Sequence, residues 1–191
     1  MRVLIADDEA LIRMGLKTML EDRGHKVVAA AVDGASALSL ARAEQPDVIL
    51  LDIKMPGMDG IEAARRIMRE RPTPVVILTA FTQRELIDEA REASVFGYLV
   101  KPIKEELLDA TLDLAVTRFK QWQQLQQEVK DLQKSLAARQ VVEDAKRVLM
   151  TEQHLTEKQA FERIHRTSRS RRVPMRQVAQ EILDKQARKK G

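Results

Sequence analysis

Residues 48–60 of the chain read VILLDIKMPGMDG. The apolar residues from Val48 to Leu51 stand at successive positions, which indicates a strand buried on both of its faces. Similar short apolar runs lie at residues 3–6, 27–31, 75–78 and 98–100, and longer stretches with helical periodicity separate them. Five such pairs of strand and helix predict a (βα)5 unit over residues 1–120, an α/β fold in which helices cover both faces of one doubly wound parallel sheet.

Polar and charged side chains stand at the ends of four of these strands. Asp7 and Asp8 follow the first strand, Asp52 follows the third, Thr79 ends the fourth and Lys101 ends the fifth. Because ligands bind outside the carboxyl ends of the strands in an open parallel sheet, we expect these side chains to converge. Three carboxylates together suit a hard cation such as Mg²⁺, which is held by carboxylates, waters and phosphate oxygens.

Charge suggests a role for each of these side chains in phosphoryl chemistry. Asp7 and Asp8 would coordinate the metal, and Asp52 would be the nucleophile, since a carboxylate can form a covalent aspartyl phosphate. Lys101 would pair with one phosphoryl oxygen and Thr79 would donate a hydrogen bond to another. Each residue alone has an ordinary explanation, such as capping a helix, but five matching residue types at strand ends favour the site.

This pattern resembles the receiver domain of two-component response regulators. The resemblance covers about residues 1–120 and implies a flavodoxin-like sheet of strand order 2-1-3-4-5. It also implies a cis peptide bond before Pro102. The motifs that carry it are Asp7-Asp8, Asp52 within DIKMPGMDG, Thr79-Ala80 and Lys101-Pro102.

The same resemblance implies the partners of the site. A sensor histidine kinase would transfer its phosphoryl group to Asp52. Mg²⁺ would be held by Asp8, Asp52 and the backbone carbonyl of Lys54, with Asp7 assisting. Tyr98 matches the switch aromatic of the family.

Composition excludes several classes of protein. None of the 191 residues is cysteine, so disulfide scaffolds, thiolate metal sites and cysteine nucleophiles are excluded. No apolar run approaches the roughly 18 residues that a membrane span needs. The first ten residues, MRVLIADDEA, lack the pattern of a signal peptide. We therefore expect a cytoplasmic protein with no membrane partner.

The chain reads as helix from Glu105 to its end. Within this region, residues 121–137 are expected to form a coiled-coil linker between two domains, and hence a homodimer. The alternative is that the same apolar stripe packs against the chain's own C-terminal helices. The stripe, with spacings of 3, 4, 3 and 4, consists of Trp122, Leu125, Val129, Leu132 and Leu136.

The residues after this stripe predict one long helix and two short ones. A break is expected from Thr151 to Leu155, and Thr156 with Gln159 has the spacing of a capping box that opens the next helix. Pro174 fits the first turn of the last helix. The expected core of this small bundle consists of Leu149, Ala160, Phe161, Ile164, Val178 and Ile182.

Basic residues concentrate near the C-terminus. Residues 1–120 carry 17 Lys and Arg against 20 Asp and Glu, whereas residues 165–191 carry nine basic residues against two acidic ones. This asymmetry suggests a polyanionic partner for the C-terminal part. Phe161 is the only aromatic residue after Trp122 and is expected on an apolar face, which excludes sheet-based RNA readers that stack bases on aromatic rings. Arginine planes and recognition of RNA shape remain.

The C-terminal pattern resembles the ANTAR domain, a transcription-antitermination output module of some response regulators. The resemblance covers about residues 135–185 and implies a domain over 138–191 that binds paired RNA hairpins in a leader transcript. Two departures stand out: Arg147 replaces a usual glycine, and the turn Gln153-His154 lacks the common glycine. The matching residues are Arg139, Val142, Ala145, Lys146, Leu149 and Met150, then Ala160-Phe161 and Ile164, then Arg171-Arg172 and Val178-Ala179.

These observations predict a regulator rather than an enzyme, phosphorylated on Asp52 and dimeric in that state, with a C-terminal domain that binds RNA. Two other functions stay open, a DNA-binding response regulator and a protein-interaction adaptor. The side chains expected to contact RNA could also serve only solubility. They are Arg139, Lys146, Arg166, Arg171 and Arg172.

Overall fold

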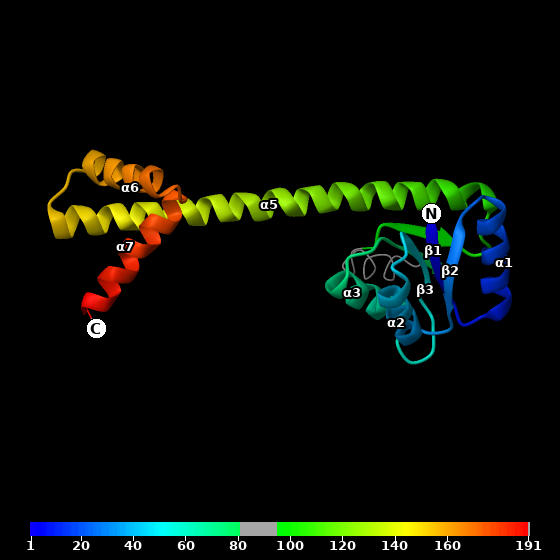
Figure 1. Cartoon of the computed structure of the whole chain (residues 1–191). Helices are drawn as coiled ribbons and strands as arrows, with labels where there is room; N and C mark the ends of the chain where they lie inside the picture. The colour runs from blue at the N-terminus through cyan, green and yellow to red at the C-terminus, as the bar shows by residue number, and fades with distance from the viewer. Residues whose placement is uncertain (81–94, 191) are drawn as a thin grey trace. The chain divides into compact units, whose positions relative to one another are not determined.

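The computed structural model describes residues 1–80 and 95–190, and its helices and strands are labelled in Figure 1. Two compact units divide the chain, an N-terminal unit of residues 1–123 and a C-terminal unit of residues 124–191. Residues 124–137 of the expected linker are grouped with the C-terminal unit. The described elements are β1 Arg2–Ala6, α1 Ala10–Asp22, β2 Lys26–Ala31, α2 Gly34–Glu44, β3 Val48–Asp52, α3 Gly60–Glu70, β4 Val75–Thr79, β5 Gly97–Val100, α5 Glu105–Gln153, α6 Glu157–Arg171 and α7 Met175–Lys190.

The five strands form one parallel sheet in the order β2-β1-β3-β4-β5, which confirms the predicted topology. All residues of β3 and β4 are buried, as continuous apolar runs require in a sheet covered on both faces. β3 and β4 each extend one residue beyond the predicted run, so Asp52 and Thr79 are the last residues of their strands. Their side chains are therefore positioned by the sheet itself.

Helices cover both faces of this sheet (Figure 1). Leu38 of α2 and Ile67 of α3 join one buried cluster, and Leu16 of α1 and Leu112 of α5 join the cluster on the other face. The helix expected between Thr79 and Gly97 falls within residues that lie outside the described ranges. Two layers of apolar packing thus hold the strand ends in place.

The C-terminal unit is a small bundle made by the end of α5 with α6 and α7. Ala145 and Leu149 of α5 pack with Ala160 and Ile164 of α6 and with Val178 of α7. The predicted capping box is present, because Thr156 accepts from Gln159 N and the Gln159 side chain accepts from Thr156 N. This cap fixes where α6 begins.

Three sequence expectations about this bundle need correction. α5 continues to Gln153, so the break is shorter than residues 151–155; it includes His154, whose φ of 54° lies in the left-handed region that favours glycine. Pro174 lies just before α7 rather than within its first turn. Phe161 is not a core residue: its side chain is 44 % exposed, because Ala160 and Ile164 already fill the face of α6 that meets the core.

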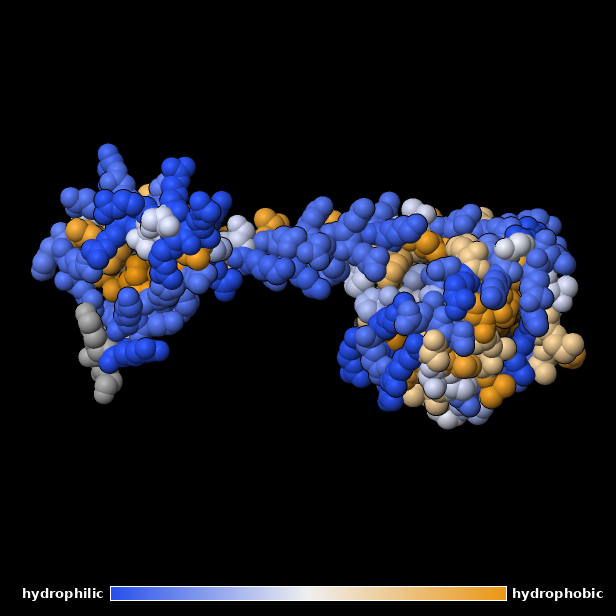
Figure 2. All heavy atoms as spheres, viewed as in Figure 1, coloured by the Kyte–Doolittle hydropathy of each residue, from blue (hydrophilic) through white to orange (hydrophobic). Residues whose placement is uncertain are grey.

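The middle of α5 carries the predicted seam. Trp122 is half-buried and packs against Phe96 and Phe119 of the N-terminal unit, with ring centroids 6.1 and 5.7 Å away. The other four seam residues are 48 to 64 % exposed, and Figure 2 shows hydrophobic side chains among polar ones along this part of α5. Among the described helices, none has a stretch long and apolar enough to cross a membrane.

Candidate functional site

Three carboxylates converge at the carboxyl edge of the sheet. Asp7 follows β1 and Asp52 ends β3, and these two strands are neighbours in the sheet. One carboxylate oxygen from each of Asp7, Asp8 and Asp52 lies within 4.8 Å of the others. Asp7 and Asp52 are buried, whereas Asp8 is exposed. Neighbouring strand ends therefore bring together an acidic group that is open to solvent on one side.

Lys101 bridges two of these carboxylates. Its Nζ lies 2.7 Å from Asp7 Oδ2 and 3.0 Å from Asp52 Oδ1. The backbone holds this lysine at the sheet edge, because Lys101 N donates to Thr79 O at 2.8 Å. The Lys101–Pro102 peptide bond is cis. One cation thus partly neutralises a group of three negative charges.

The surroundings shift the pKa values of this group. Burial raises the pKa of the Asp52 carboxyl above its ordinary value, and the neighbouring Asp7 and Asp8 carboxylates add to the rise, although Lys101 opposes it. Burial would lower the pKa of the Lys101 ammonium, but the contacts with Asp7 and Asp52 raise it above its ordinary value. Lys101 therefore remains a cation.

The oxygen atoms that this site offers as ligands fit Mg²⁺. The donors are carboxylates, which a hard cation prefers. Asp7 Oδ1 accepts from Glu9 N at 2.9 Å, whereas the buried Oδ2 accepts no aligned hydrogen bond from the described residues and touches only the Lys101 ammonium. A buried carboxylate oxygen with unused lone pairs is expected where a cation or a donor is to be bound.

A hollow of about 310 Å³ opens over the carboxylates. Thr79 is buried at the end of β4 and contributes to its wall, as does Lys54 of the loop after β3. Tyr98 is half-buried in β5 and packs against the core cluster under α2 and α3, and it does not line the hollow. The residues that line the hollow are Asp8, Glu9, Asp52, Ile53, Lys54, Thr79, Ala80 and Lys101.

Two residues that contribute to this site were not predicted from the sequence. Glu9 supplies the backbone N–H to Asp7 and lines the hollow, and its position directly after two aspartates was a usable signal. Arg13 of α1 donates through Nη1 to the Asp7 backbone oxygen at 2.7 Å. No local pattern marks Arg13, because the contact depends on how α1 packs beside β1.

Gly60 sets how closely α3 approaches β3. Its N–H donates to Ile53 O at 2.9 Å, and a Cβ added here would lie 2.0 Å from Asp52 O. Gly60→Ala must therefore displace the backbone of β3 or α3. We expect it to lower the free energy of unfolding by about 1–3 kcal/mol, measured by urea denaturation.

Gly15→Ala is the matched control, since a Cβ at Gly15 within α1 meets nothing within 4 Å. This variant should be neutral or stabilise the protein by about 0.5–1 kcal/mol, because alanine is the better helix former. Equal unfolding free energies for the two variants would contradict the close approach at Gly60.

The five cations predicted to contact RNA differ in their surroundings. Lys146 is only 7 % exposed, and its Nζ pairs with Glu143 at 2.9 Å and Glu157 at 2.8 Å. Arg171 pairs through Nη1 and Nη2 of its guanidinium with the two carboxylate oxygens of Glu181. The remaining three, Arg139, Arg166 and Arg172, are exposed, and none makes an ion pair within the described part of the chain.

Lys146 joins α5 to the first turn of α6, a position poorly placed for contact with RNA. Hydrogen bonds to Glu157 and Glu143 raise the pKa of the Lys146 ammonium, and the pKa of the Glu157 carboxyl is lowered by Lys146 in return. A lowered carboxyl pKa contributes stability above the ordinary pKa of glutamate, and that contribution disappears as the pH falls through the lowered value.

We expect Lys146→Met to reduce the free energy of unfolding slightly at pH 7, and the difference from the unmodified chain to shrink in acid as Glu157 is protonated. Urea denaturation at both pH values checks this. Lys134→Met is the control, because the one ion pair of Lys134 with a described residue is an exposed contact with Asp131 at 3.4 Å. If both variants behaved alike at all pH values, the Lys146 contacts would have no structural role.

Two known protein families match different parts of the chain. The response regulator receiver domain family matches residues 3–113, and the ANTAR domain family matches residues 130–183. The transcriptional regulatory protein PdtaR of Mycobacterium tuberculosis is 45 % identical over 183 residues, which is 96 % of this chain and 89 % of that protein.

Solved receiver domains match the N-terminal unit. The response regulator domain of Thermotoga maritima CheB is 34 % identical with a TM-score of 0.56, over 61 % of this chain and 96 % of that one. The signal receiver domain of NarL from Mycobacterium tuberculosis is 39 % identical with a TM-score of 0.57, over 60 % and 94 %. The chain therefore belongs to the response regulators, as a member that joins a receiver domain to an ANTAR output domain with an RNA-binding role in antitermination.

Proposed function

We propose that this response regulator is an antiterminator controlled by phosphorylation. In this proposal a sensor histidine kinase phosphorylates Asp52 and the chain then dimerises through α5. The two ANTAR domains of the dimer bind paired hairpins of a leader transcript. The proposed compartment is the cytoplasm. The observation that carries the proposal is that one chain joins the carboxylate cluster bridged by Lys101 to an ANTAR domain. Hairpin binding keeps a terminator from forming, so RNA polymerase reads through.

The receiver site supplies the groups that this transfer needs. A carboxylate oxygen of Asp52 attacks the phosphorus of the phosphohistidine, an O–P bond forms, and the P–N bond breaks to release the imidazole. Asp7, Asp8, Asp52 and the Lys54 carbonyl would hold Mg²⁺, which offsets the negative charge of the phosphoryl group when it is bound.

Side chains around Asp52 then respond to the new group. Lys101 Nζ, 3.0 Å from Asp52 Oδ1, turns to a phosphoryl oxygen, and the Thr79 hydroxyl donates to another. Tyr98 follows Thr79 as the switch aromatic. The face formed by β5 and α5 thereby differs between the two states, and each state has its own affinity for a partner.

The proposed partner of α5 is a second copy of the chain. Between residues 123 and 137 every side chain of α5 is exposed, so no tertiary contact of the described chain stabilises this part of the helix. An isolated helical segment of this length is marginal in water. Pairing of Leu125, Val129, Leu132 and Leu136 with the same residues of a second chain would bury the stripe, with Trp122 at its receiver end.

Contacts with RNA would come from the predicted cations that form no ion pair with a carboxylate of the described residues. Arg139, Arg166 and Arg172 meet this condition within the described residues, whereas Lys146 and Arg171 act through the fold of the bundle. Phosphate contacts release counterions, so binding should weaken as the salt concentration rises.

The test is binding of the full chain to a tandem-hairpin RNA and to duplex DNA of the same sequence, each with and without Mg²⁺ and a phosphoryl donor. We expect a preference for RNA that the donor strengthens. Equal binding or a preference for DNA would instead support a DNA-binding regulator. Absence of binding to either would support a protein-interaction adaptor.

A further inference from the structure

The loop between β3 and α3, residues 53–59, is held by two backbone hydrogen bonds. Gly60 N–H at the start of α3 donates to Ile53 O at 2.9 Å, and Gly34 N–H at the start of α2 donates to Met58 O at 3.1 Å. The second bond joins the loop to a helix that precedes β3 in the chain. α2 and α3 pack on the same face of the sheet, so the first residue of each helix reaches the loop (Figure 1).

Gly34 leaves no space for a side chain at this contact. A Cβ added to it would overlap Met58 O, and it would lie 2.9 Å from Met58 Cγ and 3.1 Å from Asp59 O. Two of these three atoms are backbone oxygens, so a change of side-chain rotamer cannot relieve the overlap. Any residue other than glycine must therefore separate the first turn of α2 from the loop.

The loop, rather than α2, gives way to such a separation. Ala37 and Ala41 of α2 are buried in the core under α2 and α3, and the Asp33 side chain caps the helix by accepting a backbone N–H of its first turn at 2.7 Å. In the loop, Lys54 and Pro56 are exposed. The helix thus has packing and a cap to hold it, and the loop has less of both.

A shift at Met58 reaches the expected metal ligands through Gly60. Gly60 lies two residues after Met58, and its N–H donates to Ile53 O, which belongs to the peptide unit that Lys54 shares. Gly60 also packs directly against the backbone of Asp52. The contact of Gly34 with the loop therefore sets the positions of the Lys54 carbonyl and of Asp52.

The two common divalent cations differ in how they tolerate such a shift. Mg²⁺ requires near-octahedral oxygens at about 2.0–2.1 Å, whereas Ca²⁺ accepts irregular geometry at about 2.3–2.6 Å. A carbonyl oxygen displaced by a few tenths of an ångström therefore costs Mg²⁺ more affinity than it costs Ca²⁺.

We infer that Gly34 is a positioning residue for the metal ion, because the first turn of α2 fixes the loop that carries the Lys54 carbonyl. Gly34 supplies no ligand of its own and acts through Met58 and Gly60. This inference rests on the proposed Mg²⁺ site and adds to it a residue of a helix that does not border the hollow.

The experiment titrates the full chain with MgCl₂ and, separately, with CaCl₂. Binding is followed by the NMR amide resonance of Glu9, whose N–H donates to Asp7 Oδ1. We expect Gly34→Ala to weaken Mg²⁺ binding by about 10- to 100-fold, the range for loss of a group that supports metal ligands. Ca²⁺ binding should weaken less, so the Mg²⁺ dissociation constant rises relative to that of Ca²⁺.

Asp33→Ala is a milder second variant, because it removes the cap of the turn that carries Gly34 without adding an atom at Gly34. The ratio of the Mg²⁺ to the Ca²⁺ dissociation constant should rise here too, by a smaller factor. Loss of the Asp33 charge acts equally on two ions of the same charge and leaves the ratio unchanged. If Gly34→Ala did not fold, an unchanged ratio in Asp33→Ala would overturn the positioning role.

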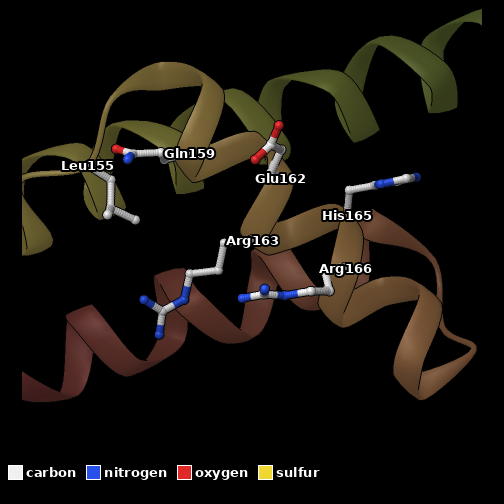
Figure 3. Close-up of a pocket in the computed structure, with 6 residues that line it drawn as sticks. All are labelled: Leu155, Gln159, Glu162, Arg163, His165 and Arg166. Carbon is white, nitrogen blue, oxygen red and sulfur yellow. The ribbon is translucent and has the colours of Figure 1, made fainter.

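Two controls separate this role from loss of stability and from adventitious binding. Ala41→Gly weakens α2 at a buried position two turns after Gly34, away from the loop, and should leave the ratio unchanged. Glu162→Gln removes a carboxylate beside a hollow of about 480 Å³ on α6, which Arg163 and Arg166 also line (Figure 3). Because two guanidinium groups repel a divalent cation there, neither dissociation constant should change.

The results distinguish this inference from the proposed metal site. If the unmodified chain binds Mg²⁺ and a folded Gly34→Ala weakens both ions equally or neither, the positioning role is wrong and the metal site stands. If Ala41→Gly raises the ratio as much as Gly34→Ala does, stability of α2 explains the effect and the role is also wrong. Failure of the unmodified chain to bind Mg²⁺ overturns the metal site and this inference together.

Discussion

Asp52→Asn abolishes covalent uptake of a phosphoryl group while the receiver stays folded. An amide oxygen is a far weaker nucleophile than a carboxylate, so no acyl phosphate forms at this position. Mass spectrometry of the full chain after incubation with Mg²⁺ and a small phosphoryl donor should show the added mass only in the unmodified protein.

The same variant should not lose stability. Asp52 is buried beside Asp7, and burial together with the neighbouring carboxylates raises its pKa, which shows that its charge is disfavoured in the fold. The neutral amide removes that repulsion, and Lys101 keeps its contact with Asp7 at 2.7 Å. Urea denaturation at pH 7 should therefore give an unfolding free energy equal to or above that of the unmodified chain.

Asp8→Asn is the matched control, because Asp8 belongs to the carboxylate group but is exposed and is not the proposed nucleophile. It should weaken Mg²⁺ binding in calorimetry and slow phosphorylation without abolishing it at high Mg²⁺. Chelation of Mg²⁺ should stop uptake in every variant. Uptake of the phosphoryl group by Asp52→Asn would place the acceptor elsewhere and end the assignment.

Asp52→Asn also separates the switch from the RNA-binding surface. The variant keeps all cations of the ANTAR domain, so its basal RNA affinity should equal that of the unphosphorylated protein. Only the gain produced by the donor should vanish. A lower basal affinity would mean that the carboxylate cluster acts through the fold rather than through phosphorylation.

Much of the receiver could be predicted from the sequence for a simple physical reason. A parallel strand buried on both faces must be apolar at successive positions, so the run before Asp52 is visible without any tertiary information. The sheet then brings the strand ends to one edge, and the convergence of Asp7, Asp52 and Lys101 follows from topology. Arg13 could not be found this way, because its contact depends on the packing of α1.

The C-terminal unit was harder to predict, because the sequence does not show which acidic residue pairs with which basic residue. Lys146 and Glu157 are 11 residues apart, and Arg171 and Glu181 are 10 apart, with a turn between each pair. Only the angle between the helices decides whether such residues meet. Sequence alone therefore could not separate cations held by carboxylates from those open to RNA.

Apolar periodicity has a similar limit. It marks a residue as apolar without saying which surface covers it. Trp122 has the spacing of the seam and packs against Phe96 and Phe119 of the receiver. Phe161 stands next to two core residues of α6 and is exposed. Phe96 lies 26 residues from Trp122, and the α5 and α7 residues that cover Ala160 and Ile164 leave Phe161 on the other side of α6. Contacts between elements therefore decide the surroundings of each ring.

Glutamate at both Val129 and Leu132 should abolish dimerisation and most of the affinity for paired hairpins. Both side chains are exposed in the single chain, at 48 and 64 %, so the fold loses no packing. In a paired helix they would bring four carboxylates into an apolar seam, where unpaired charges are costly. Sedimentation velocity under phosphorylating conditions should show only monomer.

The loss of RNA affinity follows from tethering. In a dimer the second ANTAR domain binds its hairpin as an intramolecular step, which raises the overall affinity by about 10²- to 10⁴-fold over one domain. The double variant should lose this factor on a tandem-hairpin RNA and bind a single hairpin as well as the unmodified chain does. The difference between the two RNAs separates loss of pairing from damage to the RNA-binding surface.

Gln123→Glu with Gln124→Glu is the matched control, because it adds the same charge to exposed positions of α5 that lie off the stripe. It should stay dimeric and keep the preference for tandem hairpins. If the seam variant remained a dimer, the dimer would form elsewhere, and the four exposed residues of α5 would need another partner. If it became a monomer yet kept its affinity for tandem hairpins, one ANTAR domain would suffice for recognition, and dimerisation would have to serve the receiver instead.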